Sequence, residues 1–252
     1  MQGIDGALYS GTTRSSYGYQ PGTVYKINLD GSGFTVLKLF YDVGGLTAGP
    51  CSDLLQGSDQ ALYGGTVRGV IFRINSDGNS FTELHTLEAN NWIYRPTYLA
   101  LGDDGAFYGT ESAGGPNHAG TIFKMNPDGS GFSVLHDFGA TAGDGSTPVG
   151  PLLRGSDGLW YGTTSAGGNM GCGTVFRMAP RPQIKSYGLM PSGAFQFSFV
   201  SVSNLVYRID ASMNFLDWIA LTNLTATASQ ITIADLSSTN FPQRFYRAVW
   251  IP

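Results

Sequence analysis

Short apolar segments separated by glycine-rich turns run along most of this chain. Within the segments apolar and polar residues alternate, or a few apolar residues follow one another. Both patterns are typical of β-strands, and no segment sustains the apolar spacing of about 3.6 residues that predicts a helix. Asp-Gly and Gly-Gly turns between the segments supply the positive φ angles that hairpins require. The pattern therefore predicts an all-β fold of short antiparallel strands.

Four copies of one pattern account for this regularity. Each copy has a tyrosine with an aspartate four positions before it: Asp5 and Tyr9, Asp59 and Tyr63, Asp104 and Tyr108, Asp157 and Tyr161. A Gly-Thr-apolar-aromatic-cation segment follows at 22–26, 120–124 and 173–177, and the shortened second copy has Val70 in place of the threonine. The copies recur after 45 to 54 residues, which indicates a solenoid or a propeller.

Each copy contains up to four predicted strands. An apolar strand follows Pro50, Pro96 and Pro148, and the Tyr-Gly-Thr and Gly-Thr-Val-Phe segments form the second and third strands. A more polar strand comes last and is expected on the outside. The first copy lacks the innermost strand, and the fourth lacks the outermost.

Four antiparallel strands in a repeat of this length describe a propeller blade. We therefore predict a partial or four-bladed β-propeller over residues 1–179, as an open arc or a closed ring. Its repeats cover about 1–49, 50–95, 96–147 and 148–179.

The repeat stops after Met178, where a short proline-containing linker at 180–182 begins a different pattern. Turn residues separate five further strand candidates, at 194–199, 206–211, 218–221, 230–234 and 244–249. This spacing predicts a small β-sandwich over residues 180–252.

The copies also resemble a known family. Gly-Ser-Asp-Gly-Leu-Trp-Tyr-Gly-Thr-Thr-Ser-Ala-Gly-Gly at 155–168, Gly-Thr-Val-Phe-Arg-Met at 173–178 and Asn-Pro-Asp-Gly-Ser-Gly-Phe at 126–132 resemble the GloVer tandem repeats of bacterial surface or secreted proteins. The strand order is similar to that of YVTN-type propellers. This resemblance implies a propeller and an extracellular or cell-surface location, and it implies no activity. Residues 207–218 and 244–248 resemble fibronectin type III modules.

Composition and net charge argue against two classes of partner, nucleic acids and anionic membranes. The chain has 252 residues, of which 36 are glycine and only 13% are charged, and its net charge is -4. This balance gives no electrostatic footprint for nucleic acid or an anionic membrane. No apolar run reaches the length of a membrane span. No signal peptide opens the sequence, which begins inside a repeat.

Several recurring side chains have a structural interpretation beside a functional one. The four aspartates could form a ring that holds a cation, but Asp-Gly is also the commonest tight turn, and we favour the turn. We expect the cations of the third strands to be solvated or paired with aspartate: Lys26, Arg73, Lys124 and Arg177. His85 and His136 occupy the place of Lys38, so we expect surface positions, and we expect Cys51 and Cys172 to be buried thiols.

No nucleophile elbow, zinc-protease motif, phosphate-binding loop or dinucleotide fingerprint occurs in the sequence. We therefore predict no catalytic residue, no metal site and no cofactor. Our first hypothesis is a non-catalytic extracellular or cell-surface binding or scaffold protein, whose loop residues recognise a glycan or a protein. The loop residues are Tyr17, Tyr19, Trp92, Tyr94, Asn117 and His118. The alternatives are a secreted carbohydrate-active or ester-cleaving enzyme, and a structural subunit that assembles through open blade edges.

Overall fold

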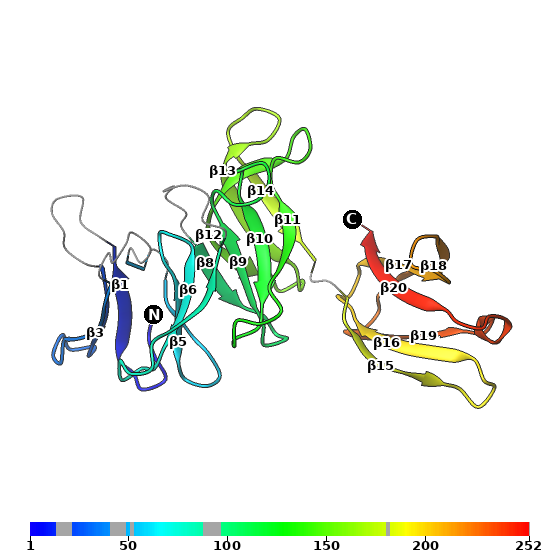
Figure 1. The fold of residues 1–252 in the computed structure, drawn as a ribbon, viewed down its shortest axis with the longest axis horizontal. Coiled ribbons are helices and arrows are strands. Elements are labelled where there is room, and N and C mark those ends of the chain that lie inside the picture. Colours follow the sequence, from blue (N-terminus) through cyan, green and yellow to red (C-terminus); the bar gives the residue numbers. More distant parts are fainter. Residues whose placement is uncertain (14–21, 41–48, 51–52, 88–96, 180–181, 252) are drawn as a thin grey trace. The chain divides into compact units, whose positions relative to one another are not determined.

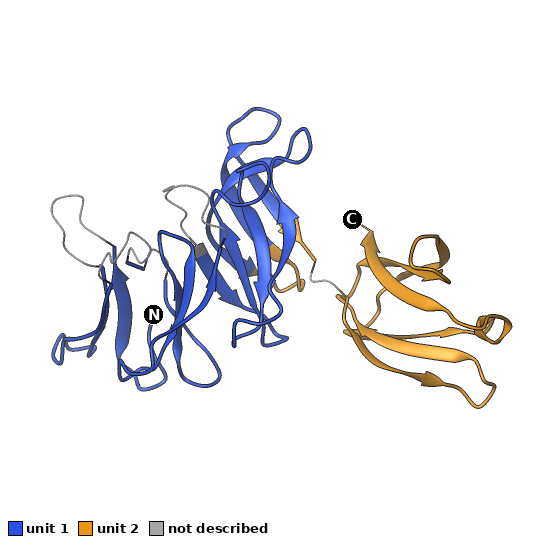
Figure 2. Ribbon diagram, viewed as in Figure 1, with its two compact units in different colours: residues 1–153, 161–176 blue, residues 154–160, 177–252 orange. Residues whose placement is uncertain are grey.

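The computed structural model describes residues 1–13, 22–40, 49–50, 53–87, 97–179 and 182–251 (Figure 1). These residues form twenty strands and a single 3-10 turn at Ser238–Asn240. The predicted all-β fold class is confirmed. The chain divides into two compact units, residues 1–153 with 161–176 and residues 154–160 with 177–252 (Figure 2).

The repeats form antiparallel meanders in which each strand pairs with the next. The second repeat has the order β4-β5-β6-β7, with strands Leu55–Gln56, Leu62–Gly65, Val70–Ile74 and Thr82–Thr86. The third repeat has the order β8-β9-β10-β11, with strands Thr97–Leu101, Phe107–Glu111, Thr121–Met125 and Ser133–Asp137. Such meanders are the predicted four-stranded blades.

The first and fourth repeats contain three strands each. The first sheet comprises β1 (Leu8–Thr12), β2 (Gly22–Ile27) and β3 (Thr35–Phe40). The fourth comprises β12 (Gly145–Arg154), β13 (Trp160–Gly167) and β14 (Thr174–Met178). By position the fourth sheet lacks the outermost strand, as predicted. The innermost place of the first sheet is not empty, because Gln2 bridges to Leu8 and Met1 exchanges hydrogen bonds with Tyr9 at 2.8 and 2.9 Å. A register shift recurs between the third and fourth strands of the first three repeats, at Val24/Tyr25, Ile71/Phe72 and Ile122/Phe123.

Apolar cores lie between consecutive repeats rather than inside one. One core joins Tyr9 and Phe40 of the first repeat to Phe72 of the second, with the Phe40 and Phe72 ring centroids 5.2 Å apart. The next joins Tyr63 of the second repeat to Phe107 of the third, at 4.6 Å. Each inner sheet is therefore covered on both faces, which explains strands such as β6 that are apolar on both sides.

The glycine that follows the tyrosine in the Tyr-Gly motif leaves room for an aromatic ring. Gly64 pairs with Phe72 across β5 and β6, and Gly109 pairs with Phe123 across β9 and β10. A Cβ at Gly109 would overlap the Phe123 ring. The glycine of the second strand therefore leaves room for the phenylalanine ring of the third strand to lie over it.

Two three-stranded sheets make up most of the second unit. One has the order β15-β16-β19, with strands Ile184–Leu189, Phe195–Val200 and Gln230–Asp235. The other has the order β18-β17-β20, with strands Trp218–Thr225, Val206–Ser212 and Phe245–Ile251. Phe197 and Phe199 of β16 share one core with Tyr207 and Ile209 of β17.

Candidate functional site

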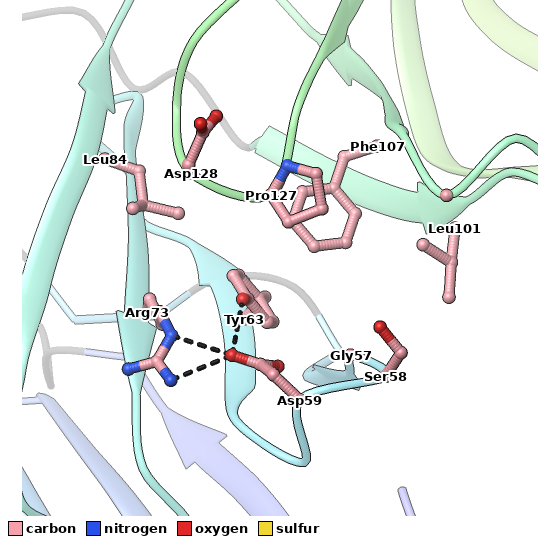
Figure 3. A pocket seen from close by; sticks show the side chains of 11 residues that line it. Gly57, Ser58, Asp59, Tyr63, Arg73, Leu84, Leu101, Phe107, Pro127 and Asp128 are labelled. Carbon is pink, nitrogen blue, oxygen red and sulfur yellow. Dashed lines mark hydrogen bonds and ion pairs between the residues drawn. The ribbon is translucent and has the colours of Figure 1, made fainter.

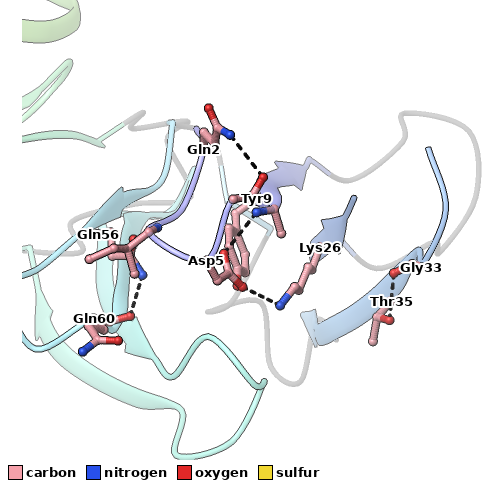
Figure 4. Close-up of polar contacts among 11 residues, drawn as sticks. Gln2, Asp5, Tyr9, Lys26, Gly33, Thr35, Gln56 and Gln60 are labelled. Atoms are coloured by element: carbon pink, nitrogen blue, oxygen red, sulfur yellow. Dashed lines mark hydrogen bonds and ion pairs between the residues drawn. The ribbon is translucent and has the colours of Figure 1, made fainter. Parts of the chain in front are cut away.

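The aspartate before each Tyr-Gly strand is held within its own repeat. Asp5 Oδ1 accepts the Ala7 N–H at 3.1 Å, and its Oδ2 accepts the Tyr9 hydroxyl at 2.8 Å and the Lys26 ammonium at 2.7 Å (Figure 4). The hydrogen bond from Lys26, followed by the one from Tyr9, lowers the pKa of Asp5 to about 2. The turn interpretation and the predicted pairing with aspartate are confirmed in this repeat.

The second and third repeats reproduce this arrangement. Asp59 Oδ2 accepts the Tyr63 hydroxyl at 3.1 Å and the Arg73 guanidinium at 3.0 and 2.8 Å (Figure 3). Asp104 accepts Tyr108 at 3.1 Å and Lys124 at 2.7 Å. These three carboxylates are bound inside separate repeats, so they form no common cation ring.

A cavity of about 400 Å³ lies between the second and third repeats at the end of the sheets that carries these turns. Asp59, Tyr63 and Arg73 line one side, and Phe107 and Pro127 line another (Figure 3). Tyr63 and Arg73 both already donate hydrogen bonds to Asp59. Their pairing makes this cavity a weak candidate for recognising a polar ligand.

Lys38 and His85 occupy equivalent places in the outer strands of the first and second repeats, and each contacts the repeat that follows. Lys38 Nζ lies 4.3 Å from the Phe81 ring centroid of the second repeat. His85 stacks on Phe132 of the third repeat, with centroids 4.0 Å apart and ring planes 16° apart. His85 is half-buried, and this burial lowers its pKa. The expected surface position is therefore wrong for His85, because the next repeat covers it; His136 is exposed.

A second cavity, of about 580 Å³, lies between the same two repeats at the opposite end of the sheets. We call it the inter-repeat cavity. Leu87, Phe132 and Val134 supply apolar surface, and Glu111 and Asp137 supply carboxylates. All of its lining residues belong to the first unit.

The two carboxylates flank one threonine in the strand register. Thr121 of β10 pairs with Glu111 of β9 on one side and with Asp137 of β11 on the other. Directly paired residues project from the same face of a sheet, so the three side chains form one row. The Thr121 hydroxyl donates a hydrogen bond to Glu111 Oε2 at 3.4 Å. Glu111 is only 4% exposed, whereas Asp137 is half-buried.

The other repeats show what this row replaces. Thr12 and Thr23 bind each other through their hydroxyls at 2.8 Å, as do Thr164 and Thr174 at 2.9 Å. Glu111 occupies the place of the first threonine of such a pair. Asp137 occupies the place of Leu39 in the first repeat and Thr86 in the second. Both carboxylates of the third repeat are therefore departures from the common pattern, and both face one cavity.

A glycine-rich loop lies against the row. A Cβ at Gly114 would overlap the Glu111 carboxylate, and one at Gly115 would lie 2.8 Å from Asp137 Oδ1. His118, in the same loop, lines the cavity and has a φ of 53°. The corresponding residue of the fourth repeat is Gly171, with a φ of 70°. A left-handed backbone is costly for a residue with a side chain and is often retained at functional sites.

The predicted binding residues have different outcomes. His118 lines the inter-repeat cavity, whereas Asn117 is exposed beside it and donates to the Phe138 carbonyl at 3.4 Å. Their binding role stays a prediction. The other four lie outside the described residues: Tyr17, Tyr19, Trp92 and Tyr94. Sequence reasoning missed Glu111 and Asp137. An alignment shows Glu111 as the exception among four copies and Asp137 as the only acidic residue among the three copies that have its strand.

Three further observations concern the described part of the chain. It contains no group of three or more histidine, cysteine, aspartate or glutamate side chains placed to hold a metal ion. Cys172 is exposed and free, so the expectation of a buried thiol is wrong there; Cys51 lies outside the described residues. No described helix has the length and apolar character needed to cross a membrane.

Solved structures resemble the chain at low identity. An extracellular domain of a protein assigned as a hybrid two-component system of Bacteroides thetaiotaomicron is 13% identical, with a TM-score of 0.49 over 87% of this chain and 28% of that one. A protein of unknown function from B. thetaiotaomicron VPI-5482 is 18% identical, with a TM-score of 0.45 over 62% and 39%. A gluconolactonase from Xanthomonas campestris is 17% identical, with a TM-score of 0.41 over 71% and 64%. The chain thus spans less than half of the first two structures.

A search of curated proteins finds no match. The family comparison does find one, and it covers the blade-like sheets described above. Residues 1–189 match the model of the Gloeobacter/Verrucomicrobia repeat, so the chain belongs to this repeat family.

Proposed function

We propose that the chain is a non-catalytic binding protein, secreted or on the cell surface, and that the inter-repeat cavity binds a glycan. The row of Glu111, Thr121 and Asp137 carries this proposal. Its oxygen atoms can accept hydrogen bonds from sugar hydroxyls, while Leu87 and Phe132 offer apolar surface to the sugar ring. The resemblance of the repeats to those of bacterial surface or secreted proteins supports the proposed extracellular or cell-surface location.

The cost of the row argues that it is retained for a purpose other than folding. Burying a carboxylate is more expensive than burying a hydroxyl, unless it is well compensated. The first and fourth repeats satisfy the same place with two threonines. The second repeat has Thr66 and Val70 there, so the third repeat is the one that places a carboxylate at this position.

The Glu111→Thr variant tests the proposal, because it gives the third repeat the threonine pair of the first and fourth repeats. We expect its free energy of unfolding to stay the same or rise by about 1 to 3 kcal/mol. We expect glycan affinity to fall at least about tenfold, or about 1.4 kcal/mol. Denaturant unfolding measures the first, and titration calorimetry on hits from a glycan array measures the second.

A matched control is Thr164→Ser, which changes the equivalent position of the fourth repeat and keeps its hydroxyl. It should bind as the wild type does. Binding that survives in Glu111→Thr would remove the cavity from the proposal. A wild-type protein without array hits at high concentration would contradict the proposed function itself.

The two carboxylates also support a second candidate, hydrolysis of a glycosidic bond. Glu111 and Asp137 lie on strands two apart, which separates their backbones by about 10 Å. Carboxylates about 5 to 9.5 Å apart perform acid and base catalysis in glycoside hydrolases. Release of reducing ends that disappears in both Glu111→Gln and Asp137→Asn would favour this enzyme over the binding protein.

Two finer assignments belong to the same proposal. We infer that residues 180–252 form a fibronectin type III-like sandwich, supported by two antiparallel sheets that share one core.

Assembly through open edges is the remaining alternative. Within the described residues β14 pairs only with β13, and such an edge can accept another chain, whereas Met1 and Gln2 pair with part of the other edge of β1. Light scattering over a range of concentrations tests it, since a constant monomer would exclude assembly.

A further inference from the structure

The described lining of the inter-repeat cavity contains two carboxylates and two histidines. Glu111 and Asp137 are the acidic residues among its described lining residues, which include neither lysine nor arginine. Its two histidines are His85 and His118. Burial lowers the pKa of His85, so its stacked ring favours the neutral form near neutral pH. With its two carboxylates ionised, the lining is negative.

From this charge and geometry we infer that the cavity binds glycans with a free amino group, such as oligomers of glucosamine, in preference to neutral or acidic glycans. This inference rests on the proposed function and adds the chemical class of its ligand. The sugar's ammonium group would lie over Thr121, between the two carboxylates that flank it.

Three physical effects favour an ammonium group there. Hydrogen bonds between charged partners are roughly twice as strong as neutral ones. Two carboxylates on one face repel each other, and a cation between them relieves this repulsion. The burial of Glu111, which is 4% exposed, reduces the screening of its charge by water. An acidic glycan would meet repulsion at the same place.

The size of the cavity suits one or two sugar rings. Gly115 and His118 of the loop line it, together with Leu87 after β7 and Phe132 before β11. A volume of about 580 Å³ lies in the range of small-molecule sites, at about 300 to 1,000 Å³. One or two sugar rings would occupy it.

The experiment compares three oligosaccharides of equal length on the full chain: a glucosamine oligomer, its N-acetylated form and a galacturonate oligomer. Acetylation removes the positive charge and leaves the ring hydroxyls in place. We expect the glucosamine oligomer to bind at least about tenfold more tightly than the acetylated one. We expect no measurable binding of galacturonate. Added salt should weaken binding of the glucosamine oligomer and leave binding of the acetylated one nearly unchanged.

The variants Glu111→Gln and Asp137→Asn keep the shape of the row and remove one charge each. Each should reduce the preference for the glucosamine oligomer several-fold. Glu83→Gln is the matched control, because Glu83 is an exposed carboxylate on β7 that does not line the cavity. Circular dichroism establishes that each variant is folded, and the salt series on the wild type needs no variant.

The possible outcomes separate the two proposals. Equal binding of the charged and acetylated oligomers overturns the charge preference and leaves glycan binding intact. No binding of any of the three, together with an empty glycan array, overturns both. If Ca²⁺ alone raises the melting temperature, and both cavity variants abolish this shift, the row is a cation site and the inference is wrong.

Discussion

At the scale of single residues, the carboxylates fall into two groups: those that recur in every described repeat, and those found in the third repeat alone. Asp5, Asp59 and Asp104 are bound by a backbone N–H, a tyrosine and a cation of their own repeats. Their recurrence reflects folding rather than recognition. Glu111 and Asp137 recur nowhere at their positions, so they are informative about function.

Acid should expose the contribution of the Asp5 group. Its pKa is lowered from 3.8 to about 2, so its stabilisation is complete above the unfolded pKa and is lost as pH falls from about 4 to 2. NMR titration of the Asp5 carboxyl carbon measures the pKa. Lys26→Met should move this pKa back toward 3.8, because Lys26 is the largest cause. An unchanged midpoint would contradict this assignment.

A second prediction concerns Gly109, which leaves room for the Phe123 ring. Gly109→Ala should lower the free energy of unfolding by about 1 to 3 kcal/mol, because the added methyl group overlaps Phe123. Gly188→Ala is the control, since a Cβ there meets nothing within 4 Å and the residue does not have a positive φ. Urea unfolding measures both, and equal stabilities would show that the ring moves aside at little cost.

At the scale of elements, the outer strand of one repeat supports the outer strand of the next. Lys38 contacts Phe81, and His85 contacts Phe132. In both pairs a cation or an aromatic ring in one outer strand contacts the phenylalanine just before the outer strand of the next repeat. This relation is visible only in three dimensions. The sequence shows the two positions but not that they belong to neighbouring repeats.

The His85 contact should respond to pH. Its folded pKa lies below the ordinary 6.5, so the neutral ring stabilises the fold above about pH 6.5, and this stabilisation is lost as pH falls through the folded pKa. In His85→Lys, which copies the first repeat, this pH dependence should disappear between pH 7 and 5. Thermal unfolding of both proteins across that range is the measurement; parallel curves would exclude His85 as the source.

At the scale of the whole molecule, the sequence predicted the blade-like sheets and the missing outer strand of the fourth repeat, because Asp-Gly turns and Gly-Thr-Val-Phe strands are local signals. The pairing of Met1 and Gln2 with β1 was missed. Strand limits were less accurate: β4 is only Leu55–Gln56, whereas β12 extends over Gly145–Arg154. The cavity could not be predicted in this way. It depends on how two repeats approach each other and on which rows of the register face the gap.

The closure of each Asp–Tyr–cation set within one repeat has an evolutionary consequence. A gene can duplicate or delete a whole module without leaving an unmatched charge in the remaining modules. The contacts between modules consist instead of apolar packing, ring contacts and a few uncharged hydrogen bonds, such as that from the Ile4 N–H to Gln56 Oε1. Such an array is free to change its length while a single member drifts toward a new ligand.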